Sequence, residues 1–191
     1  QRPEVDFDVD PKLVMLPDQK MHCYNFTKYA ERYSWDFGDG SDTSGKEAPL
    51  HQYTELGKYT VTLTAWSDKG CRSVDSLPDG VEVRGKGRLE FPNAFTPSES
   101  GPSNGYWDPE ATDNDIFHPV GEGIKKYKLE IYNKWGERLF ISHDFRVGWD
   151  GYYKGKIMKQ DVYIWKVEGE FYNGKSFEKM GDVTLLRNFP N

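Results

Sequence analysis

Strict alternation of apolar and polar residues recurs along this chain and predicts β-strands. The clearest run is Gly57–Trp66, in which Tyr59, Val61, Leu63 and Ala65 share one face and threonines occupy the other. No segment shows a sustained 3.6-residue period, so the pattern predicts an all-β protein. Shorter alternating runs occupy residues 5–9, 81–83, 127–131 and 163–167, and residues 183–187 are expected to form a last strand.

A short polar segment divides the pattern into two halves. Residues 84–88 read Arg-Gly-Lys-Gly-Arg, and the apolar pattern restarts at residue 89. Domain boundaries fall in exposed, glycine-bearing linkers of this kind. We therefore expect two domains, residues 1–86 and 87–191, each a β-sandwich. Residues 96–115 form a loop that is longer than a plain connector.

Composition supports a folded β protein and narrows the range of partners. The chain holds 6 Trp, 12 Tyr and 11 Phe, and aromatic residues favour strands. The formal net charge is −6 and neither half carries a basic field, which argues against nucleic acid as a partner. No apolar run approaches the length of a membrane span. The chain starts without a recognisable signal peptide, as expected of a mature or trimmed fragment.

The two cysteines are the next feature with chemical consequences. Cys23 and Cys71 allow a single disulfide, whose closure would stabilise the fold by about 4 kcal/mol in the chain-entropy model. We predict this disulfide, which would place the protein in an oxidising compartment. Two buried thiols are the alternative. A metal site at Cys23 with His22 has little support, because no C-x-x-C pair is present.

The stretch WDFGDGSDTS at residues 35–44 places three acidic residues at three-residue spacing. A calcium loop needs alternate oxygen ligands and a closing glutamate at its twelfth position, and neither requirement is met. Asp39 followed by Gly40 is typical of a tight turn. The stretch therefore predicts a turn, with Asp39 and Asp42 as the remaining calcium candidates. No cofactor is expected.

Three motifs in the first half together resemble the PKD domain family. They are Tyr-Ser-Trp-Asp-Phe-Gly-Asp-Gly-Ser at residues 33–41, His-Gln-Tyr at 51–53 and Gly-Lys-Tyr-Thr-Val-Thr-Leu at 57–63. The resemblance covers residues 3–84 and implies an immunoglobulin-like β-sandwich. Members of this family serve as extracellular spacers or as accessories that bind proteins or sugars.

The second half carries a series of motifs in order: FPNAFTP at residues 91–97, NDIF at 114–117, LEIYNKWGE at 129–137, GWDG at 148–151, DVYIW at 161–165 and GDVTLLR at 181–187. With these motifs it is similar to the gliding-motility-associated C-terminal domain of Bacteroidota, the type B sorting domain of the type IX secretion system. The resemblance implies export across the outer membrane and docking at the cell surface or outer membrane, with an outer-membrane β-barrel protein as partner. After Phe-Thr-Pro the chain departs from the family, because residues 98–112 replace a shorter Asn- and Gly-rich stretch.

Seven residues in these motifs are the candidates for partner recognition. For most of them the alternative is structural, since Asn133–Gly136 and Asp150-Gly151 are typical hairpin turns anchored by tryptophans. For the arginine the alternative is a solvated charge. The candidates are Trp135, Gly136, Glu137, Trp149, Asp150, Gly151 and Arg187.

Nothing in the sequence indicates an enzyme. The four histidines are isolated, and no serine lies in a nucleophile-elbow context. The acidic residues between positions 108 and 115 are expected to form a solvated loop. A carbohydrate-binding accessory module is the alternative function, because Trp66 and Tyr172 lie on predicted strands or turns where they would stack on a surface glycan.

Overall fold

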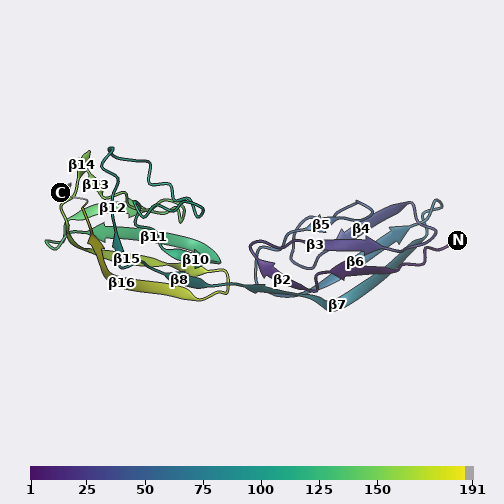
Figure 1. The fold of residues 1–191 in the computed structure, drawn as a ribbon. Helices are drawn as coiled ribbons and strands as arrows, with labels where there is room; N and C mark the ends of the chain where they lie inside the picture. Colours follow the sequence, from purple (N-terminus) through teal and green to yellow (C-terminus); the bar gives the residue numbers. More distant parts are fainter. Residues whose placement is uncertain (188–191) are drawn as a thin grey trace. The chain divides into compact units, whose positions relative to one another are not determined.

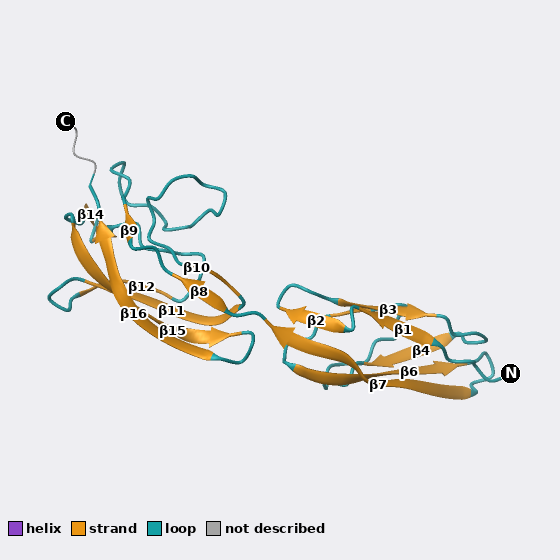
Figure 2. Cartoon of the chain, turned by 60° about the horizontal axis from the view of Figure 1, so that its bottom comes forward, coloured by secondary structure: helices purple, strands orange, loops and turns teal. Residues whose placement is uncertain are grey.

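The structure is a computed structural model that describes residues 1–187, and in this range it contains strands and no helix (Figures 1 and 2). It therefore has no helix there that would cross a membrane. The chain divides into two compact units, with the division between Lys86 and Gly87. The all-β prediction with two immunoglobulin-like sandwiches is confirmed.

The first unit is a sandwich of a three-stranded and a four-stranded sheet. The three-stranded sheet has the order β1-β3-β5, and the four-stranded sheet has the order β2-β7-β6-β4. After β1 the chain crosses from the three-stranded to the four-stranded sheet, where β2 pairs with β7 in parallel. The strands are β1 (Phe7–Asp10), β2 (Leu13–Leu16), β3 (Met21–Asn25), β4 (Arg32–Asp36), β5 (Leu50–His51), β6 (Gly57–Trp66) and β7 (Arg72–Gly85).

The core of the first unit lies where the alternation placed it. Val61, Leu63 and Ala65 of β6 are fully buried, and Trp35 of β4 is buried with them. Tyr59 follows the same face across a register shift between Tyr59 and Val61. The strand predicted at residues 81–83 is the end of a much longer strand, because β7 already begins at residue 72.

The second unit is built on a five-stranded sheet with the order β12-β11-β15-β16-β9. Its second layer comprises the β10-β8 pair and irregular segments, which Figure 2 shows lying over the sheet. The strands are β8 (Arg88–Glu90), β9 (Ala94–Phe95), β10 (Val120–Glu122), β11 (Ile124–Tyr132), β12 (Arg138–Ser142), β13 (Tyr152–Tyr153), β14 (Lys156–Ile157), β15 (Asp161–Phe171) and β16 (Ser176–Leu185).

Aromatic side chains fill the space between the sheet and its second layer. Phe95, Phe117 and Trp149 are fully buried, and Phe91 stacks on Trp165 with ring centroids 3.9 Å apart. Backbone hydrogen bonds between Phe117 and Trp149, at 2.8 and 3.0 Å, fasten the irregular layer. The predicted last strand ends earlier than expected, since β16 stops at Leu185.

Candidate functional site

The turn between β11 and β12 presents the most exposed tryptophan of the described residues. Asn133 organises this turn: its side-chain Oδ1 accepts hydrogen bonds from the backbone amides of Trp135 and Glu137, both at 3.0 Å. Gly136 adopts a left-handed φ of 82° and donates its amide to the Asn133 carbonyl. The Trp135 side chain is 83% exposed. A well-ordered turn therefore carries a large apolar group into solvent.

Side-chain contacts fix this turn to the neighbouring elements. The Tyr153 hydroxyl, from β13, donates to Glu137 Oε1 at 2.9 Å. Lys134 Nζ lies 2.8 Å from Asp161 Oδ2 at the start of β15, and 5.9 Å from the centre of the Trp135 ring. The turn is thus held against both the β13–β14 hairpin and the central strand of the sheet.

Trp149 belongs to the core, so the prediction that it contacts a partner is wrong. Its side chain is fully buried and packs against Phe95 and Tyr163, with ring centroids 5.4 and 5.0 Å away. Its indole Nε1 donates to the Tyr152 carbonyl at 3.1 Å. The buried indole is satisfied internally, as buried tryptophans usually are.

Asp150 and Gly151 shape the turn that follows this tryptophan. Asp150 accepts hydrogen bonds from the backbone amides of Ser103, at 2.8 Å, and Tyr152, at 3.0 Å, and so ties the long loop to the turn. Gly151 has φ 78°, and a Cβ there would lie 2.3 Å from Pro97 Cγ. Both residues serve the architecture of this end of the domain.

Arg187 also makes internal contacts and holds three segments together. Its Nε and Nη2 donate to Glu99 Oε1 at 3.0 and 2.9 Å, and its backbone amide donates to Gln160 Oε1 at 3.1 Å. Glu99 is 88 positions away in the sequence, so no local pattern indicated this ion pair. The arginine is neither a free recognition charge nor a simple solvated one.

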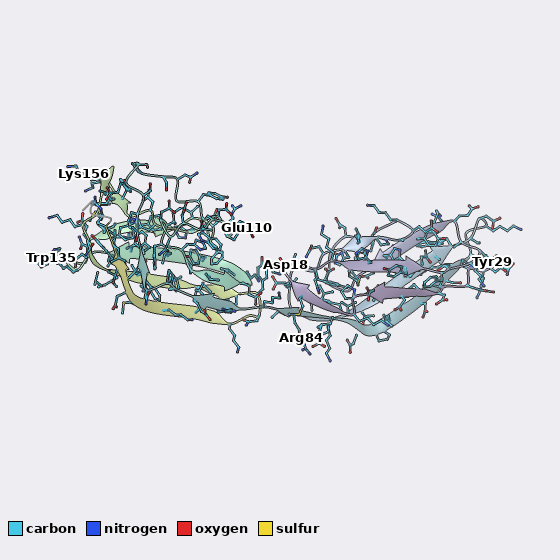
Figure 3. The ribbon with its side chains drawn as sticks, in the orientation of Figure 1. Asp18, Tyr29, Arg84, Glu110, Trp135 and Lys156 are labelled. Carbon is cyan, nitrogen blue, oxygen red and sulfur yellow. The ribbon has the colours of Figure 1, made fainter. Side chains whose placement is uncertain are left out.

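These contacts gather most of the predicted residues at one end of the second unit, which we call the Trp135 pole. Figure 3 shows Trp135 and Lys156 at this end. The sequence indicated the turn and Trp135. It did not indicate Tyr153, Lys154 and Lys156 beside them, because these residues belong to the separate β13–β14 hairpin. The Trp135 pole comprises residues 133–137 and 152–161 together with Arg187.

The acidic stretch of the first unit forms a turn, and its carboxylates are used internally. Asp39 Oδ1 accepts from the Ser41 amide and hydroxyl at 3.1 and 2.6 Å, and Asp39 Oδ2 lies 2.7 Å from His51 Nε2. Burial alone would raise the pKa of Asp39, but the hydrogen bonds from Ser41 and His51 outweigh it and hold this pKa below its usual value. Asp42 is exposed. Among residues 1–187, no group of three or more potential protein ligands is placed to hold a metal ion.

The predicted disulfide is wrong, because both thiols are free. Cys23 is buried on β3, a strand that contacts Tyr53, and Tyr53 stacks on Tyr59 near the start of β6. Cys71 follows the other end of β6, in the turn before β7, where its amide donates to Ser67 Oγ at 3.2 Å. Burial raises the pKa of the Cys23 thiol to about 12.

The two aromatic residues considered for sugar stacking lie in different units. The guanidinium of Arg32 lies 5.3 Å from the centre of the Trp66 ring and covers one of its faces. Tyr172 is half-buried and its amide donates to the Gly123 carbonyl at 2.7 Å. A glycan partner stays a prediction.

Comparison with known proteins identifies the class of each unit. Residues 24–83 match the PKD domain. A 38-residue stretch is 55% identical to the pre-pro-metalloprotease PrtV of Vibrio cholerae, covering 20% of this chain and 4% of that protein's length. The PKD1 domain of Vibrio anguillarum Epp is 32% identical over 44% of this chain and 96% of that one, with a TM-score of 0.36. The PKD1 domain of PrtV is 29% identical over 44% and 98%, with the same TM-score of 0.36.

The second unit gives the family. Residues 89–185, just over half of the 191 residues, match the CHU_C type IX secretion signal domain. The chain belongs to this family and carries a PKD domain before the signal domain. Both are non-catalytic types of module, and together they indicate a secreted or cell-surface protein related to type IX secretion. The extracytoplasmic location therefore rests on the domains and not on a disulfide.

Proposed function

We propose that residues 87–191 are an export and docking signal, recognised through the Trp135 pole by an outer-membrane β-barrel protein of the type IX secretion system. The PKD domain then serves as a spacer or interaction module in the C-terminal region of a surface or secretion-apparatus protein. The family match supports the secretion role. The observation that carries the docking surface is the exposure of Trp135 on an ordered turn.

A tryptophan in this position suits recognition by a protein pocket. Interface energy concentrates in a few anchors, of which tryptophan is among the commonest. A side chain held on a pre-ordered turn loses little conformational freedom on binding, so more of its burial energy appears as affinity. The hydrogen bonds that Asn133 Oδ1 accepts from the amides of Trp135 and Glu137 supply that order.

The polar groups around Trp135 suit the rim of such an interface. Lys134 and Asp161 form an exposed ion pair beside it, and Lys154 Nζ lies 4.7 Å from the centre of the Tyr153 ring. Exposed pairs contribute about 0–1 kcal/mol to stability, so rearranging this pair on contact with a partner costs the fold little. They remain free to adjust to a partner surface.

The test is export of a reporter carrying the whole 191-residue chain at its C-terminus in a type IX-competent host. We expect the reporter to reach the cell surface or the medium, and Trp135→Ala to leave it in the periplasm. Met180→Ala is the matched control, because Met180 is 72% exposed on β16 of the same unit. Retention of the unmodified fusion in the periplasm would refute the export role.

The same experiment separates cargo from a machinery component. If the chain docks on a membrane partner without being exported, the reporter stays periplasmic while pull-down with the chain still recovers an outer-membrane barrel protein. If Trp135→Ala then no longer recovers the barrel protein, the docking surface is supported and only the export role is refuted.

A further inference from the structure

An exposed apolar row covers the outer face of the three-stranded sheet in the first unit. Met21 and Cys23 of β3 point into the core, so the alternate residue Tyr24 points outward and is 46% exposed. Phe26 follows the same face just beyond the strand and is 57% exposed. Leu50 on β5, diagonal to Tyr24 across the sheet, is 58% exposed.

A row of carboxylates runs alongside this apolar row. Asp8 pairs with Tyr24 across β1 and β3, and Asp10 pairs with the exposed His22. Asp6 lies beside Phe26, whose amide donates to the Asp6 carbonyl at 2.8 Å. Successive members of the row are two residues apart, or about 7 Å along the strand. The β1–β3–β5 face thus combines regularly spaced negative charge with large apolar side chains.

The outer face of the other sheet shows that this combination is not a general feature of the domain. There β6 presents Thr60, Thr62 and Thr64, and Thr62 Oγ1 lies 2.9 Å from the Ser76 hydroxyl of β7; Val74 of β7, opposite Thr64, is an exposed apolar side chain among these hydroxyls. A solvated face of an antiparallel sheet is ordinarily polar in this way. Contiguous exposed apolar groups instead mark interaction surfaces.

We propose that the β1–β3–β5 face binds a cationic segment of a partner protein. Lysine or arginine side chains at alternate positions of an extended segment would meet the carboxylates of Asp6, Asp8 and Asp10, while their alkyl stems cover Tyr24 and Phe26. A second copy of this chain does not fit the face, because two acidic rows would repel one another. The site is independent of the Trp135 pole.

The segment docks on the face and not along the free edge of β1. The Val9 amide already donates to its neighbour's side chain, Asp8 Oδ1, at 2.9 Å. Lys12 forms an exposed pair with Asp8 at 3.1 Å, while the carboxylates of Asp6 and Asp10 make no such contact among the described residues. Those two carboxylates are therefore the ones most available to a cationic partner.

The test uses the whole isotope-labelled chain and the acetylated, amidated peptide Lys-Val-Lys-Val-Lys, followed by NMR chemical-shift titration. We expect saturable shifts confined to β1, β3 and β5. Asp6→Asn with Asp10→Asn is expected to weaken binding at least about fivefold, and so is Phe26→Ser. Val74→Thr, on the other sheet, is the control and leaves binding unchanged; Val74 is 48% exposed.

Each contrary result overturns the proposal. These results are the absence of saturable shifts, shifts spread over the four-stranded sheet, or equal binding of a Glu-Val-Glu-Val-Glu peptide. Binding of a neutral oligosaccharide to the face in preference to the cationic peptide would make it a glycan site instead. The asparagine substitutions change only exposed side chains, so loss of binding in that variant does not arise from unfolding.

Discussion

Replacing each of two tryptophans in the signal domain by alanine should affect its stability very differently. Trp149 is fully buried, and its loss leaves a cavity and removes the hydrogen bond to the Tyr152 carbonyl. Truncating a buried tryptophan costs about 3–5 kcal/mol, whereas substitutions of exposed side chains stay within about 0.5 kcal/mol. Trp149→Ala should therefore lower the free energy of unfolding of this domain by about 3–5 kcal/mol, and Trp135→Ala should leave it unchanged.

Native-state hydrogen exchange of the whole chain measures this difference domain by domain. In Trp149→Ala, amides of β15 and β16 should exchange about 150- to 4,000-fold faster, since 1.4 kcal/mol is a factor of ten. Amides of β6 and β7 in the first unit serve as the internal control and should not change. Comparable acceleration in Trp135→Ala, or slow exchange retained in Trp149→Ala, would refute the assignment of one tryptophan to the core and the other to the surface.

Three further predictions concern the turns, the thiols and metal. The folded-state pKa of Asp39 is depressed, so its carboxylate stabilises the first unit above the unfolded pKa of about 3.9, and this contribution is lost as the pH falls through the folded pKa. Asp39→Asn should therefore lower the melting temperature at pH 6, and by progressively less as the pH is lowered below about 3.9. Gly151→Ala should destabilise the second unit by at least about 1 kcal/mol in denaturant titration, because φ 78° and the approach to Pro97 both oppose a Cβ; Gly155→Ala, at φ 76° with open space around it, should cost less. EDTA and a thiol reductant should each leave the melting temperature unchanged, since Asp39 is bonded internally and both cysteines are free; a fall with either reagent would contradict this.

Local pattern sufficed where the structure depends on near neighbours. The alternation over Gly57–Trp66 predicted a strand and its buried face, and Asp39-Gly40 predicted a turn, because pleat geometry and turn conformation are set within a few residues. The division of the chain near residue 86 was likewise visible as a break in that pattern.

The roles of individual site residues depend on contacts that the sequence does not record. Trp135 and Trp149 both stand beside glycine in turn-like motifs, yet one is exposed and the other buried, because only the second faces Phe95 and Tyr163 across the core. The Arg187–Glu99 pair joins residues 88 positions apart. The two cysteines were paired by count, while the structure leaves both thiols free.

Recognition through Trp135 is tested most directly by photo-crosslinking. A photoreactive amino acid is placed at position 135, or at position 180 as the control, in the reporter-bearing chain expressed in a type IX-competent host. We predict that position 135 crosslinks to an outer-membrane β-barrel protein and position 180 does not. Efficient export with no crosslink from position 135, or equal crosslinking from both positions, would contradict recognition through the Trp135 pole.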